Sequence, residues 1–157
     1  MKAILLTTAL SGVLLLAACG ESDPTSGDPL TAEVSGDNIG KTCRAMHDGR
    51  ERARIERYKA RGELNAATSA EIKALFDHAR DECCAKLQEA ANAQSQSVMR
   101  VMFWDLMRDN TMSEIPAESR KATETYRLVI DNTPESDTSI ADRLYSEQQE
   151  CAGKASY

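Results

Sequence analysis

Residues 69–90 read Ser-Ala-Glu-Ile-Lys-Ala-Leu-Phe-Asp-His-Ala-Arg-Asp-Glu-Cys-Cys-Ala-Lys-Leu-Gln-Glu-Ala, and this stretch determines the fold class. Its apolar side chains recur at alternating intervals of three and four: Ile72, Phe76, Ala79, Cys83, Leu87 and Ala90. That spacing is typical of a helix with one buried stripe. Thr68 and Glu71 match a capping box. The sequence therefore predicts a long helix over 69–109 that bends or breaks within the polar segment 90–97.

Two adjacent cysteines, Cys83 and Cys84, lie in this helix, about 100° apart around its axis. Neighbours of this kind cannot easily bond to each other without distorting the backbone. Two more cysteines, Cys43 and Cys151, lie towards the opposite ends of the chain. We expect two disulfides, each stabilising the fold by about 2–4 kcal/mol, that link the long helix to two other helices. Which cysteine bonds to which partner is left open.

The remaining segments are also helical in pattern. Thr42 suits the cap of a helix over 42–61, and Gly62 suits the position after its end. Pro116 and Pro134 each suit the first turn of a further helix. No stretch alternates with the period of two that a strand needs. The predicted fold is all-α: a small bundle of four to five helices, stapled by two disulfides and formed by residues 41–157.

The N-terminus has an export pattern. Lys2 precedes an apolar run that ends in Leu16-Ala17-Ala18-Cys19. This segment resembles the signal peptide and lipobox of bacterial lipoproteins. The resemblance implies that residues 1–18 are removed, that Cys19 is acylated, and that Gly20 after it directs the protein to the outer membrane, facing the periplasm. Residues 19–40, rich in Gly, Pro, Ser and Asp, are predicted to form a flexible tether.

The chain is acidic, with a net charge of −6, but its cations gather in one segment. Residues 41–61 hold eight Lys or Arg and three Asp or Glu. Arg50, Arg54 and Arg57 are candidate contacts for an acidic protein or for lipid phosphates. The alternative is that these arginines pair with carboxylates on neighbouring helices. Aromatic side chains do not alternate with the arginines, so a nucleic-acid partner is not predicted.

Residues 98–107 are apolar on nearly every side of the expected helix. One interpretation is the densest part of the core. The other is an adaptable surface, with Met102, Phe103 and Trp104 contacting a partner protein or a second copy of the chain to form a homodimer.

No catalytic motif is present, and an enzyme is not predicted. His47 and His78 are the only conventional bases at neutral pH, and neither belongs to a hydrolase elbow or a zinc motif. Copper at the methionines is disfavoured because helical spacing already explains their positions. Zinc at His78, Cys83 and Cys84 is disfavoured because an oxidising compartment favours disulfides. We expect no cofactor and no metal.

A small, disulfide-linked, lipid-anchored acidic domain that has no catalytic motif is suited to binding other proteins. The first hypothesis is an inhibitor, immunity or exclusion lipoprotein that neutralises an enzyme or toxin. The alternative is a structural or assembly subunit of an envelope, secretion or conjugation machine.

Overall fold

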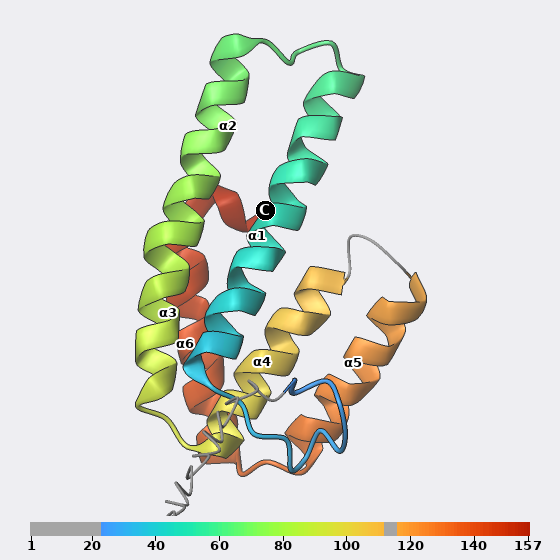
Figure 1. Cartoon of the computed structure of the whole chain (residues 1–157), viewed down its shortest axis with the longest axis vertical. Helices are drawn as coiled ribbons and strands as arrows, with labels where there is room; N and C mark the ends of the chain where they lie inside the picture. Colours follow the sequence, from blue (N-terminus) through green and yellow to red (C-terminus); the bar gives the residue numbers. More distant parts are fainter. Residues whose placement is uncertain (1–22, 112–115) are drawn as a thin grey trace, which may run out of the picture.

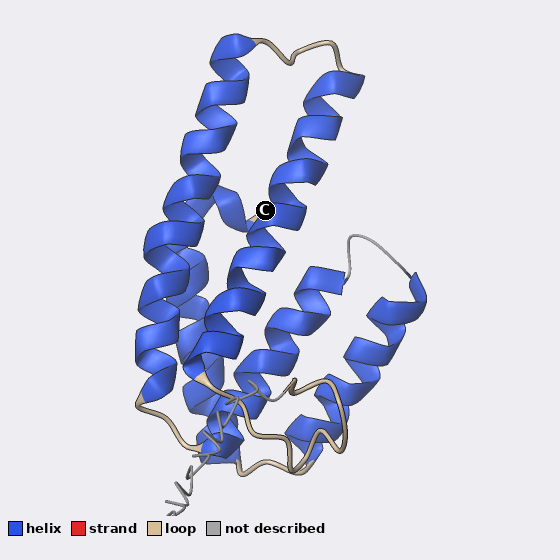
Figure 2. Ribbon diagram, viewed as in Figure 1, coloured by secondary structure: helices blue, strands red, loops and turns tan. Residues whose placement is uncertain are grey.

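A computed structural model describes residues 23–111 and 116–157, and every regular element among them is helical (Figures 1 and 2). Its helices are α1 (Gly36–Ala60), α2 (Ala66–His78), α3 (Cys84–Asn92), α4 (Gln96–Thr111), α5 (Pro116–Asp131) and α6 (Glu135–Ala152). A single π-helical turn, η1 (Ala79–Cys83), joins α2 to α3 without a break, and a 3₁₀ turn, η2 (Gly153–Ser156), follows α6. The described chain thus forms five rods, which confirms the predicted all-α bundle.

Two clusters of buried side chains hold the rods together. The larger lies among α1, α3, α4, α5 and α6 and includes Met46, Leu87, Met102, Leu106 and Leu144. The smaller lies between α1, α2 and the chain's C-terminal end, and includes Ile72, Phe76, Ala79 and Ala155. Figure 1 shows α1 and α2 extending side by side past the ends of α4 and α5. The distal part of this pair is therefore a hairpin that stands clear of the main bundle.

The long predicted helix is interrupted, and it begins earlier than predicted. Asn65, not Thr68, is its cap: the Asn65 side chain accepts from two backbone N–H groups while the Thr68 hydroxyl accepts from the Asn65 N–H. The rod ends at Asn92, and α4 starts anew at Gln96. The break expected within 90–97 is therefore confirmed, and it separates the predicted segment 69–109 into two rods. The cause is the short, polar Ala93–Ser95 link, which turns the chain back on itself.

The N-terminal boundary also differs from the prediction. Helix α1 begins at Gly36 with Ser35 as its cap, six residues before Thr42. Val34 and Ile39, which were assigned to the tether, are fully buried in the main core. The domain boundary at 40/41 was therefore wrong. Two apolar side chains in a polar segment were enough to anchor it, although they form no periodic pattern.

Residues 23–35 form an arm that lies against α4. The Gln96 amide pairs with both backbone groups of Val34, accepting from its N–H at 2.9 Å and donating to its carbonyl at 3.0 Å. Arg100 donates to the Leu30 carbonyl at 2.6 Å. The predicted cleavage site, Cys19 and the rest of residues 1–22 lie outside the described residues. Among the described helices, none is both long enough and apolar enough to cross a membrane.

Candidate functional site

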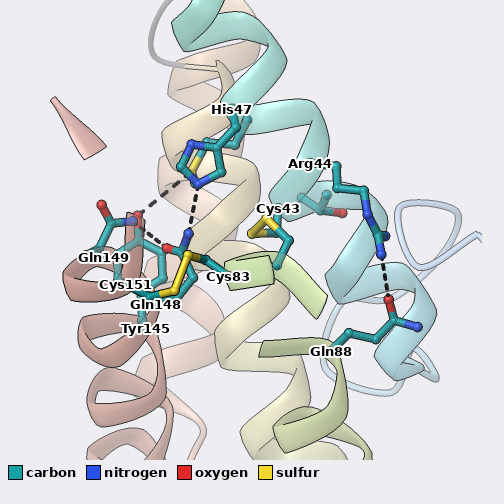
Figure 3. Close-up of a disulfide and its surroundings, with 12 residues drawn as sticks. Cys43, Arg44, His47, Cys83, Gln88, Tyr145, Gln148, Gln149 and Cys151 are labelled. Atoms are coloured by element: carbon teal, nitrogen blue, oxygen red, sulfur yellow. Dashed lines mark hydrogen bonds between the residues drawn. A yellow bond between two sulfur atoms is a disulfide. The ribbon is translucent and has the colours of Figure 1, made fainter. Parts of the chain in front are cut away.

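The two disulfides meet at the junction of η1 and α3 (Figure 3). Cys84 bonds to Cys43 of α1, and Cys83 bonds to Cys151 of α6, each with Cα atoms 5.7 Å apart. The expectation that adjacent cysteines reach two different helices is thus confirmed, and the pairing is now defined. Cys43, Cys84 and Cys83 are buried, whereas Cys151 is partly exposed.

The π turn controls which side chains surround the Cys83–Cys151 disulfide. In a regular α-helix, residues five apart point about 140° away from each other. Here the Cys84 N–H bonds to the Ala79 carbonyl, five residues back, so the helix is locally wider. His78 and Cys83 therefore lie on the same side of the rod, with His78 Nε2 3.7 Å from Cys83 Sγ. No hydrophobic periodicity signals such a contact.

The other ring nitrogen of His78 faces a carboxylate. Nδ1 lies 3.2 Å from Glu82 Oε1, one α-helical turn along the rod. An N–H on Nδ1 directed at this carboxylate leaves Nε2 facing the sulfur. Glu82, His78 and Cys83 thus form a line in which a carboxylate orients an imidazole towards a sulfur atom.

A small cavity of about 130 Å³ opens beside the same disulfide. Its walls include both sulfur-bearing residues, Cys83 and Cys151, together with Leu87 and the exposed charged side chains of Lys86 and Glu147. The Cys83–Cys151 disulfide therefore borders a cavity and includes a partly exposed cysteine, Cys151, while both cysteines of Cys43–Cys84 are buried.

His47 is the second predicted base, and the structure places it in the interior. Its Nε2 accepts from the Gln148 side-chain amide at 2.8 Å, as Figure 3 shows. Burial, together with repulsion from Arg50 and Arg80, lowers the pKa of His47 to about 4. The imidazole is therefore neutral at physiological pH, and it contributes to the packing between α1 and α6.

A chain of polar side chains continues from His47 across the bundle. Gln149 donates to Gln148 at 2.9 Å, Arg50 donates to Gln149 at 3.4 Å, and Arg50 also pairs with Asp109 of α4 at 3.4 Å. Tyr145 donates a short hydrogen bond to the same Asp109 carboxylate. The network ties α1, α4 and α6 together inside the core.

Arg108 extends the network from Asp109 to a buried carboxylate, Asp105. The Arg108 guanidinium lies 2.5 Å from Asp105 Oδ1. Burial outweighs this attraction, and Asp109 and Asp142 add repulsion, so the pKa of Asp105 rises to about 6. Asp105 and His47 are thus two buried groups whose uncharged forms the fold favours.

The predicted apolar docking surface is wrong. Met102, Phe103 and Trp104 are all buried, at 1%, 3% and 7% exposure, and they belong to the main core. The Phe103 and Trp104 rings meet edge to face with centroids 5.4 Å apart. The physical reason is that α4 is surrounded by α1, α5, α6 and the N-terminal arm, so nearly its whole circumference is covered. The alternative interpretation, a dense core segment, is the one that the structure supports.

Two of the three arginines predicted to contact a partner, Arg50 and Arg54, instead form contacts within the fold. Arg50 pairs with Asp109, as described above. Arg54 donates to the backbone carbonyls of Lys154 and Tyr157 at 2.6 and 2.5 Å, and its guanidinium lies 5.2 Å from the centroid of the Phe76 ring. Arg54 therefore holds the C-terminal end of the chain. The prediction that Arg50 and Arg54 contact an acidic protein or lipid phosphates is therefore wrong, because both side chains are engaged within the fold.

Arg57, the third, is exposed and belongs to a group of cations on the distal hairpin. We call residues 52–73 the basic hairpin. It contains six Lys or Arg and three Asp or Glu, a net charge of +3 in a chain of net charge −6. Below it, Arg80 neutralises Asp48 and Glu51 of α1 at 3.0 and 2.5 Å. Within the described residues, the guanidinium groups of Arg57 and Arg61 have no such partner.

A histidine lies near each disulfide, His47 near Cys43–Cys84 and His78 near Cys83–Cys151, but neither group can bind a metal ion through thiolates while the disulfide is intact. Cys43, His47 and Cys84 hold their ligand atoms within 4.8 Å of one another, as do His78, Cys83 and Cys151. Metal ions bind thiolates, and in both groups the two sulfurs are bonded to each other. The absence of a cofactor or metal remains a prediction.

Comparison of the chain with protein-family models, with curated proteins and with solved structures finds no match.

Proposed function

We propose that the chain is a lipid-anchored protein of the bacterial envelope that binds another protein through its basic hairpin, and that it is an inhibitor, immunity or exclusion lipoprotein. One observation carries this proposal: the hairpin stands clear of the bundle and presents two exposed guanidinium groups, Arg57 and Arg61, that have no carboxylate partner among the described residues. A projecting, charged element on a rigid, cross-linked base loses little conformational entropy on binding.

The charge of the hairpin defines the chemistry of its partner. Guanidinium groups bind carboxylates with directed hydrogen bonds, and opposite charges accelerate association. Enzymes that cleave glycans use paired carboxylates in a cleft. A basic hairpin that enters such a carboxylate-lined cleft blocks it without any chemistry of its own. The partner class is therefore an acidic surface, in the first instance the cleft of an enzyme or toxin.

The alternative, a permanent subunit of an envelope machine, is less well supported. Such subunits bury large apolar interfaces. The large hydrophobic side chains exposed among the described residues are Leu128 and Tyr157, and they do not form a patch of that kind.

The packing of the N-terminal arm shortens the tether that was predicted between the lipid anchor and the domain. The described arm, residues 23–35, lies against the helices, so less of the chain than residues 19–40 is available as a tether between the acylation site and the domain. In the proposed protein the anchor therefore holds the domain closer to the bilayer than a free tether of residues 19–40 would. Cys19→Ala tests the anchor: the variant is expected in the soluble envelope fraction, and a variant that still sediments with membranes contradicts the lipid attachment.

The binding proposal is tested by capture from envelope extracts and secreted proteins with residues 20–157 as bait, tagged at the N-terminus. Two charge reversals of equal size are compared. Arg57→Glu/Arg61→Glu alters the hairpin, and Arg120→Glu/Arg127→Glu alters exposed arginines of α5. We expect one protein to be captured by the unaltered chain and by the α5 variant but lost with the hairpin variant. Equal capture by both variants overturns the proposal.

A further inference from the structure

We propose that the Cys83–Cys151 disulfide is a site of thiol–disulfide exchange, at which an incoming thiolate attacks the Cys151 sulfur and His78 protonates the departing Cys83 thiolate. The substrate class is a reduced thiol, and the proposal does not depend on the binding function proposed above.

Three features of the site converge on this chemistry. The cavity of about 130 Å³ is bordered by the partly exposed Cys151, and this is the side from which the nucleophile approaches in the proposed reaction. His78 Nε2 lies 3.7 Å from Cys83 Sγ, on the leaving-group side. Glu82 lies 3.2 Å from His78 Nδ1 and orients the ring. Lys86 and Glu147 also line the cavity, so one positive and one negative side chain stand where the thiolate enters.

The step balances without an external oxidant. The thiolate of the substrate forms a new S–S bond with Cys151 as the Cys151–Cys83 bond breaks. The electron pair stays on the Cys83 sulfur, which takes the proton from the His78 imidazolium. In reverse, His78 accepts that proton, and Cys83 attacks the mixed disulfide and releases the substrate thiol. A leaving thiolate that is stabilised in this way departs faster.

The second disulfide of the same protein lacks each of these features. Cys43 and Cys84 have no measurable exposure, and their neighbour His47 is buried and bonded to Gln148. Cys43–Cys84 therefore serves as an internal reference for a disulfide that only stabilises the fold.

Opening the reactive disulfide has a local consequence. Cys151 lies one residue before the buried Ala152, and η2 then carries the chain to the carbonyls that hold Arg54. Reduction thus loosens the segment that fastens the base of the basic hairpin, while Cys43–Cys84 still ties α1 to α3.

The test measures how fast each disulfide opens in the folded mature chain carrying Cys19→Ala. Dithiothreitol is added at neutral pH, samples are quenched with N-ethylmaleimide, and labelled peptides are quantified by mass spectrometry. We expect Cys83–Cys151 to open about tenfold or more faster than Cys43–Cys84. His78→Ala is expected to slow only the first reaction, about tenfold, and added imidazole to restore it. Because His78 is half-exposed, the melting temperature should not change.

A matched pair of carboxyl variants separates the proposed relay from general charge. Glu82→Gln should slow the opening of Cys83–Cys151, whereas Asp81→Asn, an exposed neighbour on the same turn, should not. Two further arms, glutathione and a reduced Cys-X-X-Cys oxidoreductase, identify whether a small or a protein thiol is the better substrate. The proposal is overturned if both disulfides open at one rate set by unfolding, or if His78→Ala leaves the rate unchanged.

Discussion

Cys83 and Cys84 are consecutive in the chain, yet their sulfurs bond to different helices, α6 and α1 respectively. This single dipeptide therefore fixes the long α2–α3 rod to two neighbours. The two bonds span 68 and 41 residues, so they restrict the unfolded chain strongly. A domain of this size with few aromatic side chains depends on such restrictions.

The buried disulfide Cys43–Cys84 is expected to stabilise the main core. Cys43→Ala/Cys84→Ala should lower the free energy of unfolding by about 2–4 kcal/mol, because the unfolded chain regains the entropy of a closed loop. Chemical denaturation under oxidising conditions measures the loss. In the chain that carries Cys19→Ala and keeps the other four cysteines, titration should find no free thiols. Four reactive thiols would refute the disulfide scheme.

Asp105 is expected to destabilise the folded state at neutral pH. Its pKa is raised to about 6 in the fold, from a reference value of 3.8, so its contribution is favourable at low pH and is lost as the pH rises through 6. Asp105→Asn should therefore increase the free energy of unfolding at pH 7, by on the order of 1–3 kcal/mol. Denaturant titrations at pH 4 and pH 7 test this: the gain should be present at pH 7 and nearly absent at pH 4.

The effect of His47 on the pH dependence of stability is expected to be opposite in sign to that of Asp105. Its pKa falls to about 4 in the fold, from 6.5, so the stability it contributes is present above pH 6.5 and is lost as the pH falls towards 4. In the unaltered chain the two groups partly cancel between pH 4 and 6. In Asp105→Asn only the histidine effect remains, and its stability should fall more steeply on acidification. An identical pH dependence in both proteins would contradict these assignments.

Trp104 is expected to matter for folding and not for binding. Its side chain is buried beside Phe103, so Trp104→Ala should cost about 3–5 kcal/mol through lost burial and a cavity. Thermal unfolding measures the cost. Any Trp104→Ala protein that remains folded should still capture the partner, and selective loss of capture at unchanged stability would restore the docking interpretation.

The N-terminal arm is expected to detach when its main clamp is removed. Gln96→Ala leaves both backbone groups of the buried Val34 unpaired, at a cost of about 1–3 kcal/mol. Hydrogen exchange should increase within residues 23–35. Gln94→Ala is the control, since the Gln94 side chain donates to the Ala90 carbonyl of its own rod, and exchange in the arm should be unaffected.

The sequence predicted those features that local pattern determines. The stripe containing Ile72, Phe76 and Leu87 is buried as predicted, and the geometry of adjacent cysteines correctly indicated two separate bonding partners. Gly62 follows the end of α1 and adopts the positive φ of 69° that favours glycine after a helix. Each of these follows from residues close together in the chain.

What escaped prediction depends on contacts distant in sequence or on an irregular turn. The role of Arg54 is set by carbonyls about 100 residues away. Trp104 has the same hydropathy whether it lies in a core or on a docking surface, so only the surrounding helices decide. The meeting of His78 with Cys83 requires a π turn, and the hydrophobic spacing is compatible with an uninterrupted α-helix.

Site-specific photo-cross-linking in living cells tests the central claim most directly. A photoreactive amino acid is placed at Arg57 or Arg61 of the basic hairpin and, as a control, at Arg127 of α5. We expect the two hairpin positions to cross-link to one and the same envelope or secreted protein, and Arg127 not to cross-link to it. Cross-links from Arg127 with none from the hairpin would contradict the claim, because the binding surface would then lie on the opposite part of the bundle.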